Sequence, residues 1–239
     1  MVRMRAIVRA AASFSSMGMY DTEALVQDIG LRGWTKFNLE EATDDILEKS
    51  ILTLASALGR IDPGRGGQLI ERIVPLIEER AHQSSLSRRY GIHDFPFHND
   101  TAHRVLPTRY VILVCAQPGS VDVPTWLLDT SLIKFTMEQL NYLRSSVFFV
   151  RNGRKSFYSS MLPEHCRFYR VDPGCMEPIN KEAELALDIF APESVEAYAQ
   201  KISWKRGTVV AFDNWRVLHR RGSGATESSK RVLYRCSAV

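Results

Sequence analysis

Two histidines and one carboxylate are the residues of this sequence whose types and spacing point most clearly to chemistry. His98 and Asp100 are separated by one residue, so on a strand their side chains leave the same face. An imidazole and a carboxylate make a mixed nitrogen and oxygen site, which a second histidine from a distant strand would complete. Such a set, bound on one face of Fe(II), leaves three coordination positions open for reactants. We expect His219 to be the second histidine, because it closely follows an apolar run at residues 208–212.

A His-x-Asp triplet alone is weak, since such triplets arise by chance and His98 could be a hydrogen-bonded histidine of the core. Two arginines near the C-terminus add weight to the metal interpretation. Arg231 and Arg235 lie on one face of an apolar strand-like run and require an anion to neutralise them. A dicarboxylate suits them, because a guanidinium binds a carboxylate in a bidentate fork. For Arg231, a surface position on an edge strand remains a competing interpretation.

The elements that must position these side chains are predicted to be strands accompanied by a few helices. Asn38 and Glu41 have the spacing of a capping box that would begin a helix, and residues 151–154 have the composition of a hairpin turn. Strands are predicted at residues 34–37, 69–77, 110–115, 147–150, 155–159, 167–171, 208–212 and 231–237, and helices at 21–29, 38–58, 131–143 and 192–202. This order predicts an α+β fold with a mainly β core, and it fits a double-stranded β-helix (jelly roll) with flanking helices.

The composition is that of a globular protein, with 45% apolar and 24% charged residues among 239. We expect a single domain over residues 1–239, in which residues 1–30 could be an N-terminal extension. Residues 1–20 resemble a weak transit peptide, although an extension or strand leading into the domain is the preferred interpretation. The sequence shows no run long enough to span a membrane, and a net charge of +4 without a basic run argues against nucleic-acid binding. Four cysteines without a regular spacing indicate free thiols, and we expect a cytoplasmic protein.

The sequence resembles the taurine dioxygenase (clavaminate synthase-like) family of Fe(II)/2-oxoglutarate-dependent dioxygenases. The similar features extend from about Gly33 to Arg235, and the order His-x-Asp, Thr, His, Arg is far more specific than any single piece. The matching motifs are Leu86-Ser87-Arg88-Arg89-Tyr90-Gly91, Pro96-Phe97-His98-Asn99-Asp100, Pro107-Thr108-Arg109-Tyr110-Val111, Pro124-Thr125-Trp126-Leu127-Leu128-Asp129 and Phe212-Asp213-Asn214-Trp215-Arg216-Val217-Leu218-His219. Val123-Pro124, Arg220 and Asn99 depart from the common pattern, which bears on the substrate more than on the chemistry.

The resemblance implies that His98, Asp100 and His219 bind Fe(II) and are the catalytic residues. Thr125 and Arg235 would hold the far carboxylate of 2-oxoglutarate, and Arg231 would lie near the carboxylate that binds the metal. The implied reaction uses 2-oxoglutarate and O2 to oxidise an unactivated C–H bond of a small molecule, usually by hydroxylation, with release of succinate and CO2. An amino acid or a natural-product intermediate is the preferred substrate.

Two other functions stay open at this stage. One is a cupin-like metal-dependent hydrolase or lyase that uses the same three ligands. It would not require the threonine and arginine residues that fit a dicarboxylate. The other is a non-catalytic jelly-roll binding protein in which the metal site is vestigial.

Overall fold

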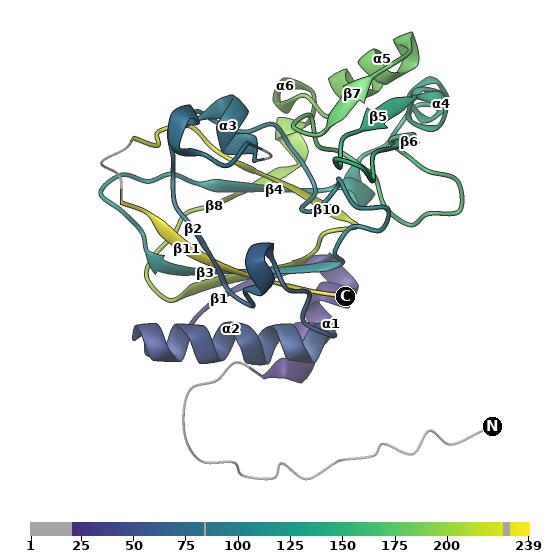
Figure 1. The fold of residues 1–239 in the computed structure, drawn as a ribbon. Coiled ribbons are helices and arrows are strands. Elements are labelled where there is room, and N and C mark those ends of the chain that lie inside the picture. The colour runs from purple at the N-terminus through teal and green to yellow at the C-terminus, as the bar shows by residue number, and fades with distance from the viewer. Residues whose placement is uncertain (1–20, 84, 227–229) are drawn as a thin grey trace, which may run out of the picture.

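Two antiparallel sheets face each other across the middle of the molecule (Figure 1). The computed structural model describes residues 21–83, 85–226 and 230–239. The larger sheet has the strand order β1 (Trp34–Asn38), β9 (Thr208–Asp213), β3 (Tyr110–Gln117), β11 (Val232–Ala238) and β2 (Glu71–Ile73). The smaller sheet has the order β10 (Val217–Arg221), β4 (Thr125–Asp129) and β8 (Ala199–Ile202).

Apolar side chains from both sheets fill the layer between them. On β3, Val111 and Leu113 point into this layer, whereas Ile112 points to the opposite face. This alternation is the period of two that a β-strand imposes on its side chains. Leu127 from β4 and Leu233 from β11 pack in the same layer, so the two sheets share one interior.

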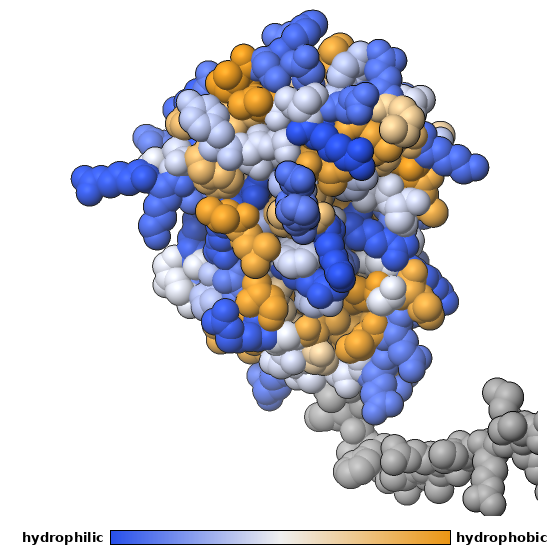
Figure 2. Space-filling view, turned by 90° about the vertical axis from the view of Figure 1, so that its right-hand side faces the viewer, coloured by the Kyte–Doolittle hydropathy of each residue, from blue (hydrophilic) through white to orange (hydrophobic). Residues whose placement is uncertain are grey.

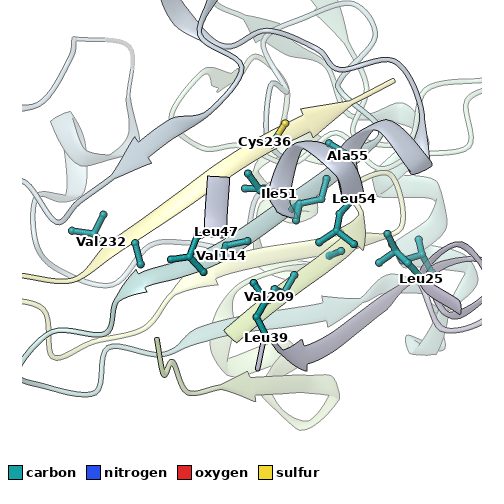
Figure 3. Packing of buried hydrophobic residues seen from close by; sticks show 14 residues of the cluster. Leu25, Leu39, Leu47, Ile51, Leu54, Ala55, Val114, Val209, Val232 and Cys236 are labelled. Atoms are coloured by element: carbon teal, nitrogen blue, oxygen red, sulfur yellow. The ribbon is translucent and has the colours of Figure 1, made fainter. Parts of the chain in front are cut away.

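Helix α2 (Asp44–Leu58) covers the outer face of the larger sheet, where its buried side chains meet those of the strands (Figures 1 and 3). The helix begins after Thr43, whose hydroxyl accepts a hydrogen bond from the backbone N–H of Ile46. Its apolar stripe includes Leu47, Ile51 and Leu54, which are fully or almost fully buried.

Helix α1 (Thr22–Arg32) packs beside α2, and its Leu25 and Ile29 belong to the same apolar cluster. The described part of the expected N-terminal extension is therefore integrated into the core. Residues 1–20, where a transit peptide was considered, lie outside the described residues.

A third region packs against the outer face of the smaller sheet, above and to the right in Figure 1. The antiparallel pairing of β5 with β6 confirms the predicted hairpin. This region contains β5 (Phe148–Val150), β6 (Phe157–Ser159), β7 (Met176–Pro178), α4 (Met137–Ser145), α5 (Lys181–Ile189) and α6 (Pro192–Val195). The remaining elements are α3 (Leu86–Tyr90) and the 3₁₀ turns η1 (Arg65–Gly67), η2 (Glu78–Arg80), η3 (Thr130–Leu132) and η4 (Glu196–Tyr198).

Several predicted boundaries were wrong. Asn38 does not cap a helix, because it ends β1 and its side chain accepts a hydrogen bond from the Thr208 hydroxyl. The helix predicted at 131–143 begins six residues later, where Thr136 and Gln139 form a capping box. The strand predicted at 69–77 is limited to the three residues of β2.

Two other predictions mistook the type of structure. The helix predicted at 192–202 ends at Val195, and Ala199–Ile202 instead pair with β4 as strand β8. No strand forms at residues 167–171. Arg170 holds this segment by donating hydrogen bonds to the carbonyl oxygens of Ala102, Arg104 and Val105.

The surface of the described part shows hydrophilic side chains through the middle of one face, with apolar residues in small groups between them (Figure 2). No helix of residues 21–83, 85–226 and 230–239 is both long enough and apolar enough to cross a membrane.

Candidate active site

His98 and His219 lie opposite each other on neighbouring backbone segments. The backbone N–H of each donates to the carbonyl oxygen of the other at 3.0 Å, and their ring centroids are 4.3 Å apart. His219 stands on β10, all of whose residues are buried. His98 belongs to no strand and makes only this isolated bridge. The bridge brings the two imidazoles together from distant parts of the sequence.

Asp100 completes a cluster with the two histidines. One possible ligand atom from each of the three side chains lies within 4.8 Å of the others, and all three residues are buried. The expected strand beneath His98 and Asp100 is replaced by the bridge and a turn, in which Thr101 has a φ of 57°. The structure therefore brings together the three residues that the sequence singled out, although by a different local conformation.

The protonation states in this cluster suit a divalent metal. Burial and the neighbouring His98 lower the pKa of His219 to about 3, so its imidazole is neutral, as metal binding requires. Burial opposes ionisation of Asp100, but Arg235 and the two histidines outweigh it and lower the pKa of the carboxyl. His98 Nδ1 lies 3.0 Å from the Pro96 carbonyl oxygen, an arrangement that leaves Nε2 as the free nitrogen.

Two buried polar atoms of the cluster have no hydrogen-bond partner among the described residues. They are Oδ2 of Asp100 and Nδ1 of His219. Leaving a buried polar group without a partner costs about 1–3 kcal/mol, and more when the group is charged. An Fe(II) ion can satisfy carboxylate oxygen and imidazole nitrogen together, so the residues present fit this metal.

Arg235 is held at the metal cluster by two carboxylates. Its guanidinium donates to Asp100 Oδ1 at 2.7 Å and, through two nitrogens, to Glu71 Oε2 at 2.8 and 3.0 Å. Burial opposes the charge of Arg235, but Asp100 and Glu71 outweigh it and raise the pKa of the guanidinium. Arg235 is thus neutralised within the protein.

Arg231 has different surroundings. It is 4% exposed, its Nη1 donates to the Val123 carbonyl oxygen, and its Nε has no hydrogen-bond partner among the described residues. Burial lowers the pKa of Arg231 to about 10. Thr125 lies two residues beyond Val123, and its buried hydroxyl accepts a hydrogen bond from Trp204 Nε1 at 3.0 Å. Because that bond uses the oxygen as acceptor, the Thr125 O–H can still donate to a ligand.

The model of the taurine catabolism dioxygenase TauD, TfdA family matches residues 130–237. That stretch contains His219 and both arginines, and the fold brings His98 and Asp100 to it. The match covers a little less than half of the chain and is to a family of dioxygenases. A solved structure of similar fold, the non-haem iron oxygenase OrfP with 18% identity and a TM-score of 0.68, is in complex with Fe and alpha-ketoglutaric acid.

Solved structures with a similar fold extend over 91% of this chain. One is an asparagine oxygenase in complex with Fe(II), 2S,3S-3-hydroxyasparagine and succinate, with 18% identity, a TM-score of 0.72 and 77% of its own chain covered. Another is the non-haem iron oxygenase OrfP in complex with Fe, succinate and (3S)-hydroxy-L-Arg, with 15% identity, a TM-score of 0.71 and 80% coverage. No curated protein sequence matches the chain.

Three further arginines near the cluster residues have partners within the protein. Arg104 pairs with Asp62, and Arg109 lies 3.4 Å from Asp213. Arg220 packs its guanidinium over two aromatic rings and lies 3.6 Å from Asp94. Each of these arginines thus has a structural contact.

Asp172 is a residue near the cluster that the sequence interpretation missed. Burial raises the pKa of its carboxyl, which also experiences the charges of His98 and Asp100. It accepts hydrogen bonds from the backbone N–H of Gly174 and from the thiol of Cys175. In the sequence, Asp172 looked like the first residue of a turn, and no local signal distinguishes such an aspartate from one that faces a metal cluster.

Proposed function

We propose that this chain is a non-haem iron dioxygenase that uses Fe(II), 2-oxoglutarate and O2 to hydroxylate a carbon atom of a free amino acid or of a closely related small amine. The observation that carries the proposal is the buried convergence of His98, Asp100 and His219 next to a further carboxylate, Asp172. When bound, Fe(II) and 2-oxoglutarate supply the oxidising power for C–H cleavage, with O2 consumed and succinate and CO2 released.

In this proposal, His98, Asp100 and His219 hold the metal. Asp100 is present as a carboxylate and His219 as a neutral imidazole before the metal binds, so little rearrangement of protons is required. Arg235 and Glu71 fix the orientation of the Asp100 carboxylate.

The contacts support a different division of work between the two arginines from the one expected. Arg235 lies against the metal ligand Asp100, so we assign it to the metal-binding end of 2-oxoglutarate. Arg231 and Thr125 would hold the far carboxylate, because no carboxylate of the described residues pairs with that guanidinium and that hydroxyl can donate. The proposed cofactor-binding residues are still Thr125, Arg231 and Arg235, but the roles of the two arginines are exchanged.

Asp172 is assigned to the substrate. Its partly buried carboxylate can pair with the ammonium group that every free amino acid carries, or with the guanidinium group of a basic one. The similar solved structures hold hydroxyasparagine and hydroxyarginine, which supports an amino acid as the class of substrate.

The facing antiparallel sheets support the jelly-roll interpretation of the fold, and the integrated α1 supports a single domain. All four cysteines are free thiols, which supports the expected cytoplasmic location. We retain the proposal of a small-molecule substrate without nucleic-acid or membrane partners.

Anaerobic addition of Fe(II) and 2-oxoglutarate tests the metal site first. A visible metal-to-ligand charge-transfer band is expected, and its absence from folded protein would favour a hydrolase, a lyase or a non-catalytic binding protein. A panel of free amino acids is then screened by coupled succinate production under air, and the product is checked by mass spectrometry for one oxygen atom from ¹⁸O2.

Asp172→Asn is the matched variant for the screen, because it keeps the size of the side chain and removes its charge. With an amino acid that is turned over, this variant is expected to raise the substrate KM while the charge-transfer band is retained. An unchanged KM would remove Asp172 from the substrate site and leave the metal assignment intact.

A further inference from the structure

Asn99, the residue between the two ligands of the His-x-Asp motif, is only 1% exposed and joins two other segments of the chain. Its side-chain N–H donates to the carbonyl oxygen of Asn214, and its side-chain oxygen accepts from the backbone N–H of Val171 at 2.9 Å. Its backbone N–H donates to the Val171 carbonyl oxygen at 2.8 Å. Asn99 therefore ties the metal motif to the segment that carries Asp172.

Asn214 is fully buried and holds the backbone of Asp100 from both sides. Its Oδ1 accepts from the Asp100 N–H at 2.8 Å, while its Nδ2 donates to the Asp100 carbonyl oxygen at 3.0 Å. The same Nδ2 donates to the Thr108 carbonyl oxygen at 2.8 Å. Both amide N–H groups and the amide oxygen of one side chain are thus in use.

The two asparagines form one connected network, because the side chain of Asn99 binds the backbone of Asn214. A buried network of this kind is rigid when every member is satisfied and costly when one is lost. No hydrophobic residue can replace either amide, since the backbone groups of Val171 or Asp100 would then remain buried without a partner.

We propose that Asn99 and Asn214 are positioning residues that hold Asp100 in its metal-binding orientation and keep the Asp172 segment in fixed relation to it. They act on the site through the backbone and touch neither the metal ligand atoms nor the substrate. The inference rests on the proposed function, because it assumes that Asp100 binds Fe(II) and that Asp172 faces the substrate.

The first experiment is an anaerobic titration of the full chain with Fe(II) at saturating 2-oxoglutarate. The intensity of the charge-transfer band measures how much Fe(II) is bound. Asn99→Val and Asn99→Thr have nearly the same shape and differ by one hydroxyl, which can both donate and accept. Loss of a group that orients a metal ligand typically weakens metal binding by about 10- to 100-fold. We expect this loss for Asn99→Val and for Asn214→Ser, and a smaller one for Asn99→Thr.

Asn180→Ala is the matched control. Asn180 also joins backbone segments, through Ser145, Val147 and Ala183, but it lies at the start of α5 and not at the triad. Its replacement is expected to lower Tm and to leave the Fe(II) affinity unchanged. If Asn99 and Asn214 had a purely structural role, their variants would also show a lower Tm with an unchanged Fe(II) affinity.

The second experiment measures hydrogen exchange in residues 168–174. In the natural chain, Fe(II) with 2-oxoglutarate is expected to slow exchange in residues 98–100 and in this segment together. In Asn99→Val, the response of residues 168–174 should be smaller relative to that of residues 98–100, because the side-chain bond to the Val171 N–H is lost and only the backbone bond remains.

An Fe(II) affinity within twofold of the natural chain in Asn99→Val and Asn214→Ser overturns the inference. Should Asn99→Val fail to fold, the affinity of Asn214→Ser decides in the same way. If the natural chain itself gives no charge-transfer band, the proposed function is contradicted. If the natural chain gives the band and the variants bind Fe(II) equally well, only the positioning role is contradicted.

Discussion

The two ends of the proposed 2-oxoglutarate site differ in how their arginines are neutralised. At the metal end, formed by His98, Asp100, His219 and Arg235, the arginine is already neutralised by Asp100 and Glu71. At the carboxylate end, formed by Thr125, Trp204 and Arg231, the guanidinium is more deeply buried, and the hydrogen bond it makes within the described residues is to a backbone carbonyl. Both arginines come from one short stretch of the chain.

This difference in partners indicates which of the two arginines is available to bind an anionic ligand. A buried guanidinium without a carboxylate partner loses hydration that a ligand can replace, whereas a paired one has less to gain. Sequence spacing alone shows that both arginines share a face. It does not show which of them is already paired.

Loss of a metal ligand should have the largest effect on turnover and should distinguish the metal end from the carboxylate end most clearly. Asp100→Ala or His219→Ala is expected to abolish 2-oxoglutarate turnover, because two remaining side chains cannot keep the metal in a productive geometry. Succinate formation is the measurement, with Tm as the control for folding. Full activity in either variant would refute the assignment of these ligands.

At the carboxylate end, Arg231→Gln should raise the KM for 2-oxoglutarate by about 10- to 100-fold, since a charge-assisted hydrogen bond contributes roughly 1.5–3 kcal/mol. The Fe(II)-dependent kcat at saturating 2-oxoglutarate should change much less. Steady-state kinetics at several 2-oxoglutarate concentrations distinguish the two effects. If the KM for 2-oxoglutarate were the same as in the natural enzyme, Arg235 and not Arg231 would be assigned to the far carboxylate of 2-oxoglutarate.

Arg235→Gln should raise the KM for 2-oxoglutarate by less than Arg231→Gln does, by about tenfold at most. The reason is that Arg235 already has two carboxylate partners in the protein. The comparison must be made at saturating Fe(II), because Arg235 also contacts Asp100. If the order of the two variants is reversed, the contrast between the ends is wrong.

Thr125→Val should have the smallest effect, a rise in the KM for 2-oxoglutarate of about fivefold, because it removes one neutral hydroxyl worth roughly 1 kcal/mol. The shape is conserved, so Tm should show little change beyond the lost contact with Trp204. Combining Thr125→Val with Arg231→Gln in a double-mutant cycle should reveal coupling. Additive effects would place the two residues on different ligand groups.

Much of the site could be predicted from the sequence, because a distinctive order of residue types carries it. His98, Asp100 and His219 lie together as the pattern indicated, Arg235 contacts Asp100, and Thr125 and Arg231 are buried. The strong strands at 110–115 and 208–212 were found because buried β-branched runs have a clear signature.

The remaining features depend on tertiary contacts that a local pattern does not contain. Residues 199–202 favour a helix locally, yet pairing with β4 makes them a strand. Asp172 gains its position from a segment held by Arg170 and Asn99. The roles of Arg231 and Arg235 depended on Glu71, a carboxylate from β2 whose proximity no sequence spacing could indicate.

The reciprocal backbone bonds between His98 and His219 also make assembly of the site a late event in folding. The N-terminal half of the chain carries two ligands but cannot form the metal-binding cluster until β10 has been synthesised and has docked. Premature capture of iron by a partly folded chain, where it could drive oxidative damage, is thereby disfavoured.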